Sequence, residues 1–361
     1  MAAAGTFLLA ACAEPPAESP PVDSIGGGIA DAPVEVVVRD PRLALFSPLP
    51  ERMESAANEL TLAKINLGRK LYYDPRLSKN QDVSCNTCHL LDKFGVDGLP
   101  TSVGHLQQVG TRNAPTVYNA AGHISQFWDG RVTTVEEQAK GPLLNPIEMA
   151  MEDEAAVEAV LMSIPGYAPL FAAAFPDTED AISFNNMAQA IGAFERGLVT
   201  RSRFDDYLAG DDTVLNEVEQ AGVIAFMDVG CSNCHSGPYL GGSMYQKLGL
   251  VQPWADISDL GRFDVTGKNE DMQVFKVPSL RNVSQTGPYF HDGSVGSLNE
   301  AVRLMARHQL GVELTNEQVI SIIAFLNSLD GTIDDDFIMM PELPASGKVL
   351  PELEIEPVEV R

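Results

Sequence analysis

The chain has 361 residues, of which 45% are hydrophobic, so it is long enough for two domains of ordinary size that each bury a core. Acidic residues dominate: 50 Asp and Glu stand against 24 Lys and Arg, which gives a formal net charge of −26. This balance argues against nucleic acid and anionic membrane surfaces as partners and favours a basic partner.

Residues 1–12 are apolar and end in small residues before Cys12, which predicts an export signal. The stretch Leu9-Ala10-Ala11-Cys12 also resembles a bacterial lipoprotein box, in which the cysteine becomes the lipidated first residue of the mature protein. The alternative is an alanine-rich leader with an incidental cysteine. Cys12 is therefore a candidate lipid anchor.

The two ends of the remaining chain differ from its middle. Residues 13–50 are rich in proline and contain three consecutive glycines, Gly26–Gly28, which predicts an extended tether. Residues 333–361 form an acidic tail, which we expect to be a loop or a segment that wraps the surface. Between them we predict two domains, residues 51–200 and 201–332.

Two short motifs take four of the five cysteines: residues 85–89 read CNTCH and residues 231–235 read CSNCH. A zinc site needs its cysteine pairs close together, and a redox dithiol has no need of the histidine. The third alternative is covalent haem, because two thiols at this spacing reach the two vinyl groups of one haem and the next histidine binds iron. We predict two c-type haems, one held by Cys85, Cys88 and His89 and the other by Cys231, Cys234 and His235. Bacteria attach such haems outside the cytoplasm, so the motifs also favour the periplasm.

The sequence outside the two motifs has the pattern of helices. From Ser183 onward, apolar residues recur at helical spacing, and the stretches that begin at Ser297 and Thr315 resemble capping boxes. Strand-type alternation is scarce, and glycine- and proline-rich stretches surround both haem motifs. We therefore predict a mainly α protein with two cytochrome c-like haem domains and long loops.

An internal repeat relates the two halves. Residues 115–139 align without a gap on residues 278–302, with seven identical positions that include Asp129-Gly130 and Asp292-Gly293. Each half is therefore interpreted as one haem-binding unit that was duplicated and then diverged.

The second ligand of each iron is left open by these patterns. In the second half, Met305 and His308 lie on much the same face of one predicted helix, and either can reach iron. In the first half, His105 lies in a glycine-rich loop that can swing, or it is an ordinary surface histidine.

Two polar residues distinguish the first half from the second. Gln126 and Glu136 stand where the repeat has Tyr289 and Asn299. A carboxylate beside an open iron can move a proton between the oxygens of a peroxide, and an amide can hold the peroxide by hydrogen bonding. The alternatives are a capping box of Glu136 with Thr133 and a solvent-facing Gln126.

Four stretches together resemble a known family. The runs LGRKLYYDPRLSKNQDVSCNTCH, GTRNAPTVYNA, QFWDGR and FKVPSLRNVSQTGPYFHDGSV are similar to those of the bacterial dihaem cytochrome c peroxidases, and the resemblance spans roughly residues 58–330 in the family's order.

The resemblance implies a role for each haem. Cys85, Cys88 and His89 would bind the peroxidatic haem, with His105 as a removable ligand and Gln126 and Glu136 in the peroxide pocket. Cys231, Cys234, His235 and Met305 would bind a haem of high potential that stores and receives electrons. A calcium ion between the domains would take the Asn113 side chain and the carbonyls of Thr286 and Pro288.

The resemblance also implies a reaction. One electron on the second haem would loosen the loop of His105, and hydrogen peroxide would then be reduced to water while Glu136 moves the proton. The donor would be a small cytochrome c or a blue copper protein, a basic one suiting this acidic chain, and the enzyme would be a homodimer.

Two other functions are considered. One is the related dihaem oxidase that acts on tryptophans of a partner protein, against which Met305 argues because that relative has a tyrosine there. The other is a dihaem electron carrier without peroxidase activity, in which His105 never leaves iron. The family's tryptophan between the haems is missing near Thr116, and Trp128 is a candidate substitute.

Overall fold

The computed structural model describes residues 39–254 and 258–346, so the predicted export signal and Cys12 lie outside the described residues. The described residues from Pro41 onward belong to one compact unit. The described part is mainly helical, as expected, and its sheet has only two strands. None of the helices in these ranges is by itself long and apolar enough to cross a membrane; the pair Glu154–Ser163 and Tyr167–Ala174 passes that test jointly but is bent by 113°.

The N-terminal lobe is built around one pair of helices. Its helices are α1 (Leu62–Tyr73), α2 (Cys85–Cys88), α3 (Val135–Leu144), α4 (Glu154–Ser163), α5 (Tyr167–Ala174) and α6 (Phe184–Glu195). Helix α1 packs directly on α6, and a Cβ at Gly68 would lie only 1.8 Å from the Ala190 carbonyl oxygen, so this position needs glycine. The helix expected from Ser183 onward is α6, which Ser183 caps, and the apolar residues of that helix face the core.

The C-terminal lobe carries the second motif. Its helices are α7 (Arg203–Ala209), α8 (Glu217–Val229), α9 (Phe263–Thr266), α10 (Leu298–Met305) and α11 (Asn316–Asn327). Helix α10 continues into one π-helical turn, Ala306–Leu310. The strands β1 (Tyr245–Lys247) and β2 (Val274–Lys276) pair antiparallel, with Tyr245 opposite Lys276. Thr315 and Gln318 form the expected capping box, whereas at Ser297 the structure has the serine cap alone.

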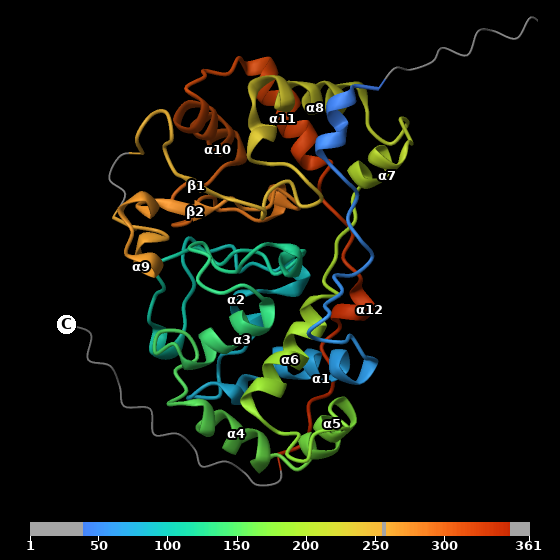
Figure 1. The fold of residues 1–361 in the computed structure, drawn as a ribbon, viewed down its shortest axis with the longest axis vertical. Coiled ribbons are helices and arrows are strands. Elements are labelled where there is room, and N and C mark those ends of the chain that lie inside the picture. The colour runs from blue at the N-terminus through green and yellow to red at the C-terminus, as the bar shows by residue number, and fades with distance from the viewer. Residues whose placement is uncertain (1–38, 255–257, 347–361) are drawn as a thin grey trace, which may run out of the picture. The chain divides into compact units, whose positions relative to one another are not determined.

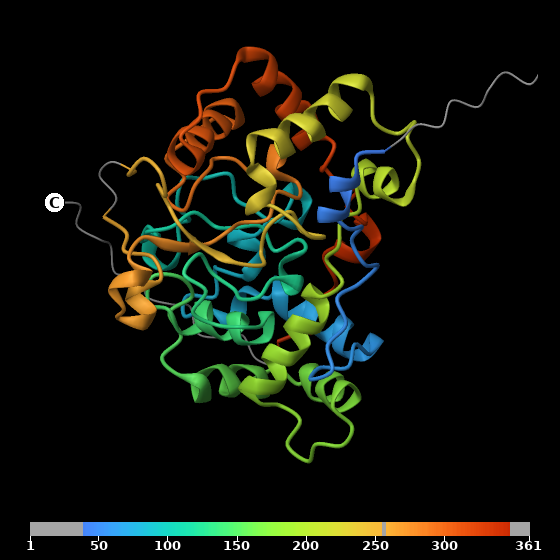
Figure 2. The same cartoon turned by 45° about the horizontal axis from the view of Figure 1, so that its top comes forward.

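Each end of the described chain packs on the lobe that is distant from it in sequence. Leu43 and Phe46 enter the core of the C-terminal lobe, and Leu49 is 2% exposed. The predicted tether is therefore wrong for residues 41–49, because these apolar side chains fill a core and Pro41–Leu45 forms a 3₁₀ helix. In the turned view of Figure 2 this blue segment lies beside α8.

The segment after residue 333 returns to the N-terminal lobe. Helix α12 (Asp335–Ile338) places Phe337 on Phe194 of α6 with ring centroids 5.2 Å apart, and the Tyr73 hydroxyl donates to the Ile338 carbonyl. Figure 1 shows α12, late in the sequence, beside α6 and α1. The start of the expected acidic tail is thus a packed strap on this lobe.

The aligned halves have the same conformation at several positions. Asn119 and Asn282 both have a positive φ, near 60°, and so do Phe127 and Phe290. The amide groups of Asn119 and Asn282 donate to the same acceptor, the Thr200 hydroxyl, over 2.9 and 2.8 Å. One threonine between the halves therefore ties together two equivalent turns.

Candidate functional site

The first motif opens onto a large cavity in the N-terminal lobe. Ser84 and Thr87 form a capping box that starts α2 and thereby fixes Cys85 and Cys88. These two cysteines and His89 line about 1480 Å³ of empty space, including its open mouth. Its walls also come from residues 110–117 and from α3, so both cysteines and the histidine of the motif face the same cavity.

The second motif opens onto a separate cavity in the C-terminal lobe. Cys231, Cys234 and His235 line about 1200 Å³ of empty space, mostly apolar, together with Met305 from the end of α10. His308 is absent from this lining; its Nδ1 lies 2.9 Å from the Gln252 carbonyl oxygen and its ring packs on Trp254. The structure thus brings Met305, and not His308, to the second motif.

Both motif histidines are held in the same way. Nδ1 of His89 lies 3.2 Å from the Gly95 carbonyl oxygen, and Nδ1 of His235 lies 3.0 Å from the Leu240 carbonyl oxygen. A backbone acceptor at Nδ1 fixes the ring and leaves Nε2 as the lone-pair nitrogen, which is the usual arrangement of a histidine that binds a metal. The two histidines are therefore prepared to bind iron.

The motif cysteines are unlike redox-active thiols. Burial raises the pKa of Cys88 to about 11 and that of Cys231 to about 12, and it also raises the pKa of the Cys85 and Cys234 thiols. Reactive dithiols have lowered pKa values instead. Neutral thiols on apolar walls, each pair followed by an oriented histidine, fit covalently bound haem.

Gln126 and Glu136 occupy different positions at the first cavity. Gln126 lines it and donates from Nε2 to the Ala120 carbonyl over 2.8 Å. Glu136 lies behind the wall: it is 4% exposed and forms a bidentate ion pair with Arg196, at 2.7 and 2.9 Å, while Asn58 donates to it over 2.9 Å. The capping-box alternative for Glu136 is wrong, because Thr134 caps α3 and accepts from the Glu137 N–H.

Glu136 remains ionised in this setting. Burial by itself would raise the pKa of its carboxyl group, but the hydrogen bonds from Arg196 and Asn58 outweigh burial and lower the pKa. The carboxylate can therefore accept a proton, but its immediate partners restrict its movement.

A second acid, Glu195, was missed by sequence reasoning. It lines the first cavity from α6, and burial, followed by the nearby charge of Glu136, raises its pKa to about 8. The signal was present, because Glu195 lies four residues after Ile191 and so falls on the apolar face of its helix. An acidic residue on the apolar face of a helix indicates a buried carboxyl group, which is a candidate functional residue.

His105 lies on the loop that edges the first cavity. Ser102 and Gly104 line the cavity, whereas the His105 side chain is not in the lining, is 7% exposed and has no hydrogen-bond partner at Nδ1. The His105 backbone N–H donates to the carbonyls of Ile147 and Glu148. The structure therefore holds His105 next to the cavity by its backbone.

A third cavity lies between these two and shares lining residues with both. Asn113, Thr286 and Pro288, the predicted calcium ligands, all line it. The Asn113 amide nitrogen donates to the Leu99 carbonyl, so its oxygen points away from that bond. The described lining contains no Asp or Glu, so a calcium ion here would depend on neutral oxygens, of the kind that Ca²⁺ accepts, and on added groups.

Trp128 borders all three cavities, and its indole Nε1 donates to the Asn113 carbonyl over 2.9 Å. The other tryptophan, Trp254, packs on Phe290 and His308. Trp128 is thus the indole that lies between the two motif cavities.

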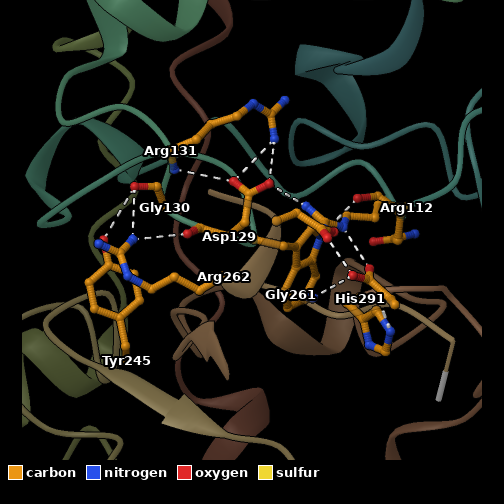
Figure 3. A network of polar contacts seen from close by, with 12 residues as sticks. Arg112, Asp129, Gly130, Arg131, Tyr245, Gly261, Arg262 and His291 are labelled. Atoms are coloured by element: carbon orange, nitrogen blue, oxygen red, sulfur yellow. Dashed lines mark hydrogen bonds and ion pairs between the residues drawn. The ribbon is translucent and has the colours of Figure 1, made fainter. Parts of the chain in front are cut away.

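A polar network joins the two halves near the His105 loop. Arg112, at the end of that loop, binds Asp129 of its own half at 2.5 Å and Asp259 of the other half at 2.6 and 2.7 Å. Figure 3 shows Arg112 between Asp129 and the side of the network where His291 lies. Nε2 of His291, which lines the C-terminal cavity, is 3.9 Å from an oxygen of Asp259. Arg262 adds two bonds from the C-terminal half to the carbonyls of Asp129 and Gly130.

Known proteins resemble this chain over most of its length. The family model described as "Di-haem cytochrome c peroxidase" matches residues 62–213. Cytochrome c551 peroxidase of Pseudomonas aeruginosa is 47% identical over 320 residues, covering 87% of this chain and 92% of the relative. The protein of the same name from Nitrosomonas europaea is 42% identical, covering 91% and 94%. Among solved structures, a MauG-like protein associated with microbial copper homeostasis is 31% identical with a TM-score of 0.73, covering 81% of this chain and 97% of that one.

Proposed function

This chain belongs to the di-haem cytochrome c peroxidase family, and from that premise we propose that it reduces hydrogen peroxide in the periplasm with electrons from a small cytochrome c or a blue copper protein. It is a dihaem peroxidase, and its family implies two c-type haems. The donor, the compartment and the division of labour between the haems are part of the proposal.

The observation that carries the division of labour is the difference between the two cavities. The C-terminal cavity has His235 and Met305, which suit an iron with two protein ligands that transfers electrons. The N-terminal cavity has His89, a lining amide from Gln126 and a lining acid in Glu195. Haem supplies the redox chemistry when bound, and the polar side chains of the first cavity suit a site for peroxide.

The chain's own groups can handle protons at the first cavity. Gln126 lines the cavity and can hold the peroxide by its amide. Glu136 is ionised and lies behind the wall, so it can take the proton of peroxide when its side chain turns from Arg196 toward the cavity. We infer that Glu136 moves the proton. Glu195, which stays protonated at the cavity wall, is the proton donor beside it. In the same account His105 is the removable ligand of the first iron, carried by a loop whose end Arg112 ties to the C-terminal half.

Other parts of the proposal have narrower support. The matched turns at Asn119 and Asn282 support two domains that arose by duplication, 51–200 and 201–332. The shared cavity of Asn113, Thr286 and Pro288 supports the calcium site. The homodimer and a lipid anchor at Cys12 rest on the resemblance and on the sequence alone.

The test of the peroxide site is Glu136→Ala, with peroxide turnover measured on protein that retains two haems per chain. We expect a loss of about 10²–10⁴-fold in kcat, the usual contribution of a positioned acid–base group. Glu137→Ala is the matched control, because Glu137 is the exposed neighbour on the same helix. Full turnover by Glu136→Ala would contradict the assignment. An electron carrier, the alternative, would show no peroxide turnover in any form.

A further inference from the structure

Lys276 is a buried cation at the junction of the two halves. It is the last residue of β2, is 8% exposed, and lines both the C-terminal cavity and the cavity between the motifs. Its ammonium nitrogen donates to the Ser125 carbonyl over 2.9 Å and lies 3.3 Å from Nδ1 of His123. Both of these partners come from the N-terminal half.

Lys276 forms no ion pair with a carboxylate among the described residues. The carboxylate that acts on it from a distance, Asp129, is bound by Arg112 and Arg131. Burial lowers the pKa of Lys276 to about 8. A buried ammonium without an anion is costly, so this position is explained best by an anion that comes from outside the polypeptide.

One N–H of Lys276 remains for such an anion. An ammonium has three N–H groups, and Ser125 and His123 accept two of them. Because His123 accepts at Nδ1, its hydrogen is on Nε2, which is buried and has no hydrogen-bond partner. His123 is itself in the lining of the cavity between the motifs, where its ring packs on Tyr239.

We propose that Lys276, oriented by His123, binds a carboxylate that projects from the C-terminal cavity, namely a propionate of the haem held there. The inference rests on the proposed placement of that haem. Cys231 and Cys234 would hold the vinyl edge of the macrocycle, and its propionates would need a cation elsewhere. Lys276 lines the same cavity as these two cysteines and can supply that cation.

The charge of Lys276 then sets the potential of this haem. Reduction adds a negative charge to the haem, and a nearby cation in a poorly solvated site favours that state. Lys276 therefore helps to make the second haem the better electron acceptor of the pair.

The test is Lys276→Met, with the potentials of both haems measured by spectroelectrochemical titration without peroxide. We expect the reduction equilibrium of the C-terminal haem to become at least about tenfold less favourable, which is about 59 mV for one electron, and its propionate band in the resonance Raman spectrum to shift. Lys276→Arg should keep the potential close to that of the wild type. Lys247→Met is the matched control, because Lys247 is exposed on the partner strand β1.

Two results would overturn the proposal. One is an unchanged potential and Raman band in Lys276→Met, or in Lys276→Gln if the methionine variant fails to load haem. The other is a wild-type potential that depends on added inorganic phosphate and loses this dependence in the variant, which would assign the site to a free anion. A loss of peroxidase activity alone counts neither way, so this test is separate from that of the proposed function.

Discussion

Two acids beside the N-terminal cavity are held in opposite protonation states by their neighbours. Arg196 and Asn58 keep Glu136 ionised, whereas burial and the charge of Glu136 keep the pKa of Glu195 near 8. Environments that push two pKa values apart are a common way to obtain an acid and a base from the same side-chain type. The cluster therefore has a proton acceptor and a proton donor at neutral pH.

The raised pKa of Glu195 predicts a pH-dependent gain from Glu195→Gln. The carboxyl group has a pKa of about 8 in the folded chain and about 4.3 in the unfolded chain. Between these values the unfolded chain has released the proton and the folded chain has kept it, so wild-type stability falls as pH rises. The melting temperature of the variant should exceed that of the wild type by an amount that grows from pH 5 to pH 8, when both are measured by circular dichroism.

The control for this prediction is Glu137→Gln, because Glu137 is exposed on α3. Its difference from the wild type should not grow over the same range. An equal effect of Glu195→Gln at pH 5 and pH 8 would show that Glu195 is not held protonated.

At the residue scale, candidates could be named from the sequence where the chemistry is local in sequence. Each haem motif is five consecutive residues, so its meaning does not depend on the fold. Met305 and His308 were both candidates on one face of a predicted helix, and the structure brings Met305 to the second cavity. The pairing of Glu136 with Arg196, 60 residues away, depends on the packing of α3 on α6 and leaves no local pattern.

At the scale of elements, the loop of His105 is tied down at its end by a bridge between the halves. Arg112 binds Asp259, and Asp259 lies near His291, a residue of the C-terminal cavity. The bridge is therefore a physical connection between the second haem site and the loop that carries the proposed removable ligand of the first.

We expect Arg112→Leu to loosen this loop. The variant would leave Asp259 without its bidentate partner, so His105 should leave iron more readily in the fully oxidised protein. The measurement is the rate of cyanide binding to the oxidised N-terminal haem, which should rise. Arg307→Leu is the control, because it removes an exposed arginine–glutamate pair within the C-terminal lobe. Equal rates of cyanide binding in Arg112→Leu and the wild type would show that the Arg112 bridge does not restrain the His105 loop.

Helices were predictable where a capping residue marks the N-terminus in the sequence. Thr315 caps its helix as expected, because the capping residues and the apolar stripe are adjacent in sequence. The terminal segments were not predictable in this way. Proline-rich text indicated a tether, but Leu43 and Phe46 find partners such as Phe204 more than 150 residues away.

At the scale of the whole molecule, the net charge of −26 should govern the encounter with a donor. With a basic cytochrome c as donor, kcat/KM should fall steeply between about 0.01 M and 0.15 M salt, as the Debye length shrinks from about 30 Å to about 8 Å. With an uncharged small reductant, the same change in salt should have little effect. If kcat/KM with the basic donor does not depend on salt, the net charge of the chain does not govern the choice of donor.

The account's central claim is that electrons enter through the Met305 side and release a gate at His105 before peroxide is reduced. The most direct measurement is peroxide consumption with a reduced cytochrome c as donor, comparing fully oxidised protein with protein that has first received one electron. The account predicts turnover from the start in the half-reduced protein and a lag in the oxidised protein. Immediate and equal turnover in both would contradict the gate, and no turnover in either would contradict the peroxidase itself.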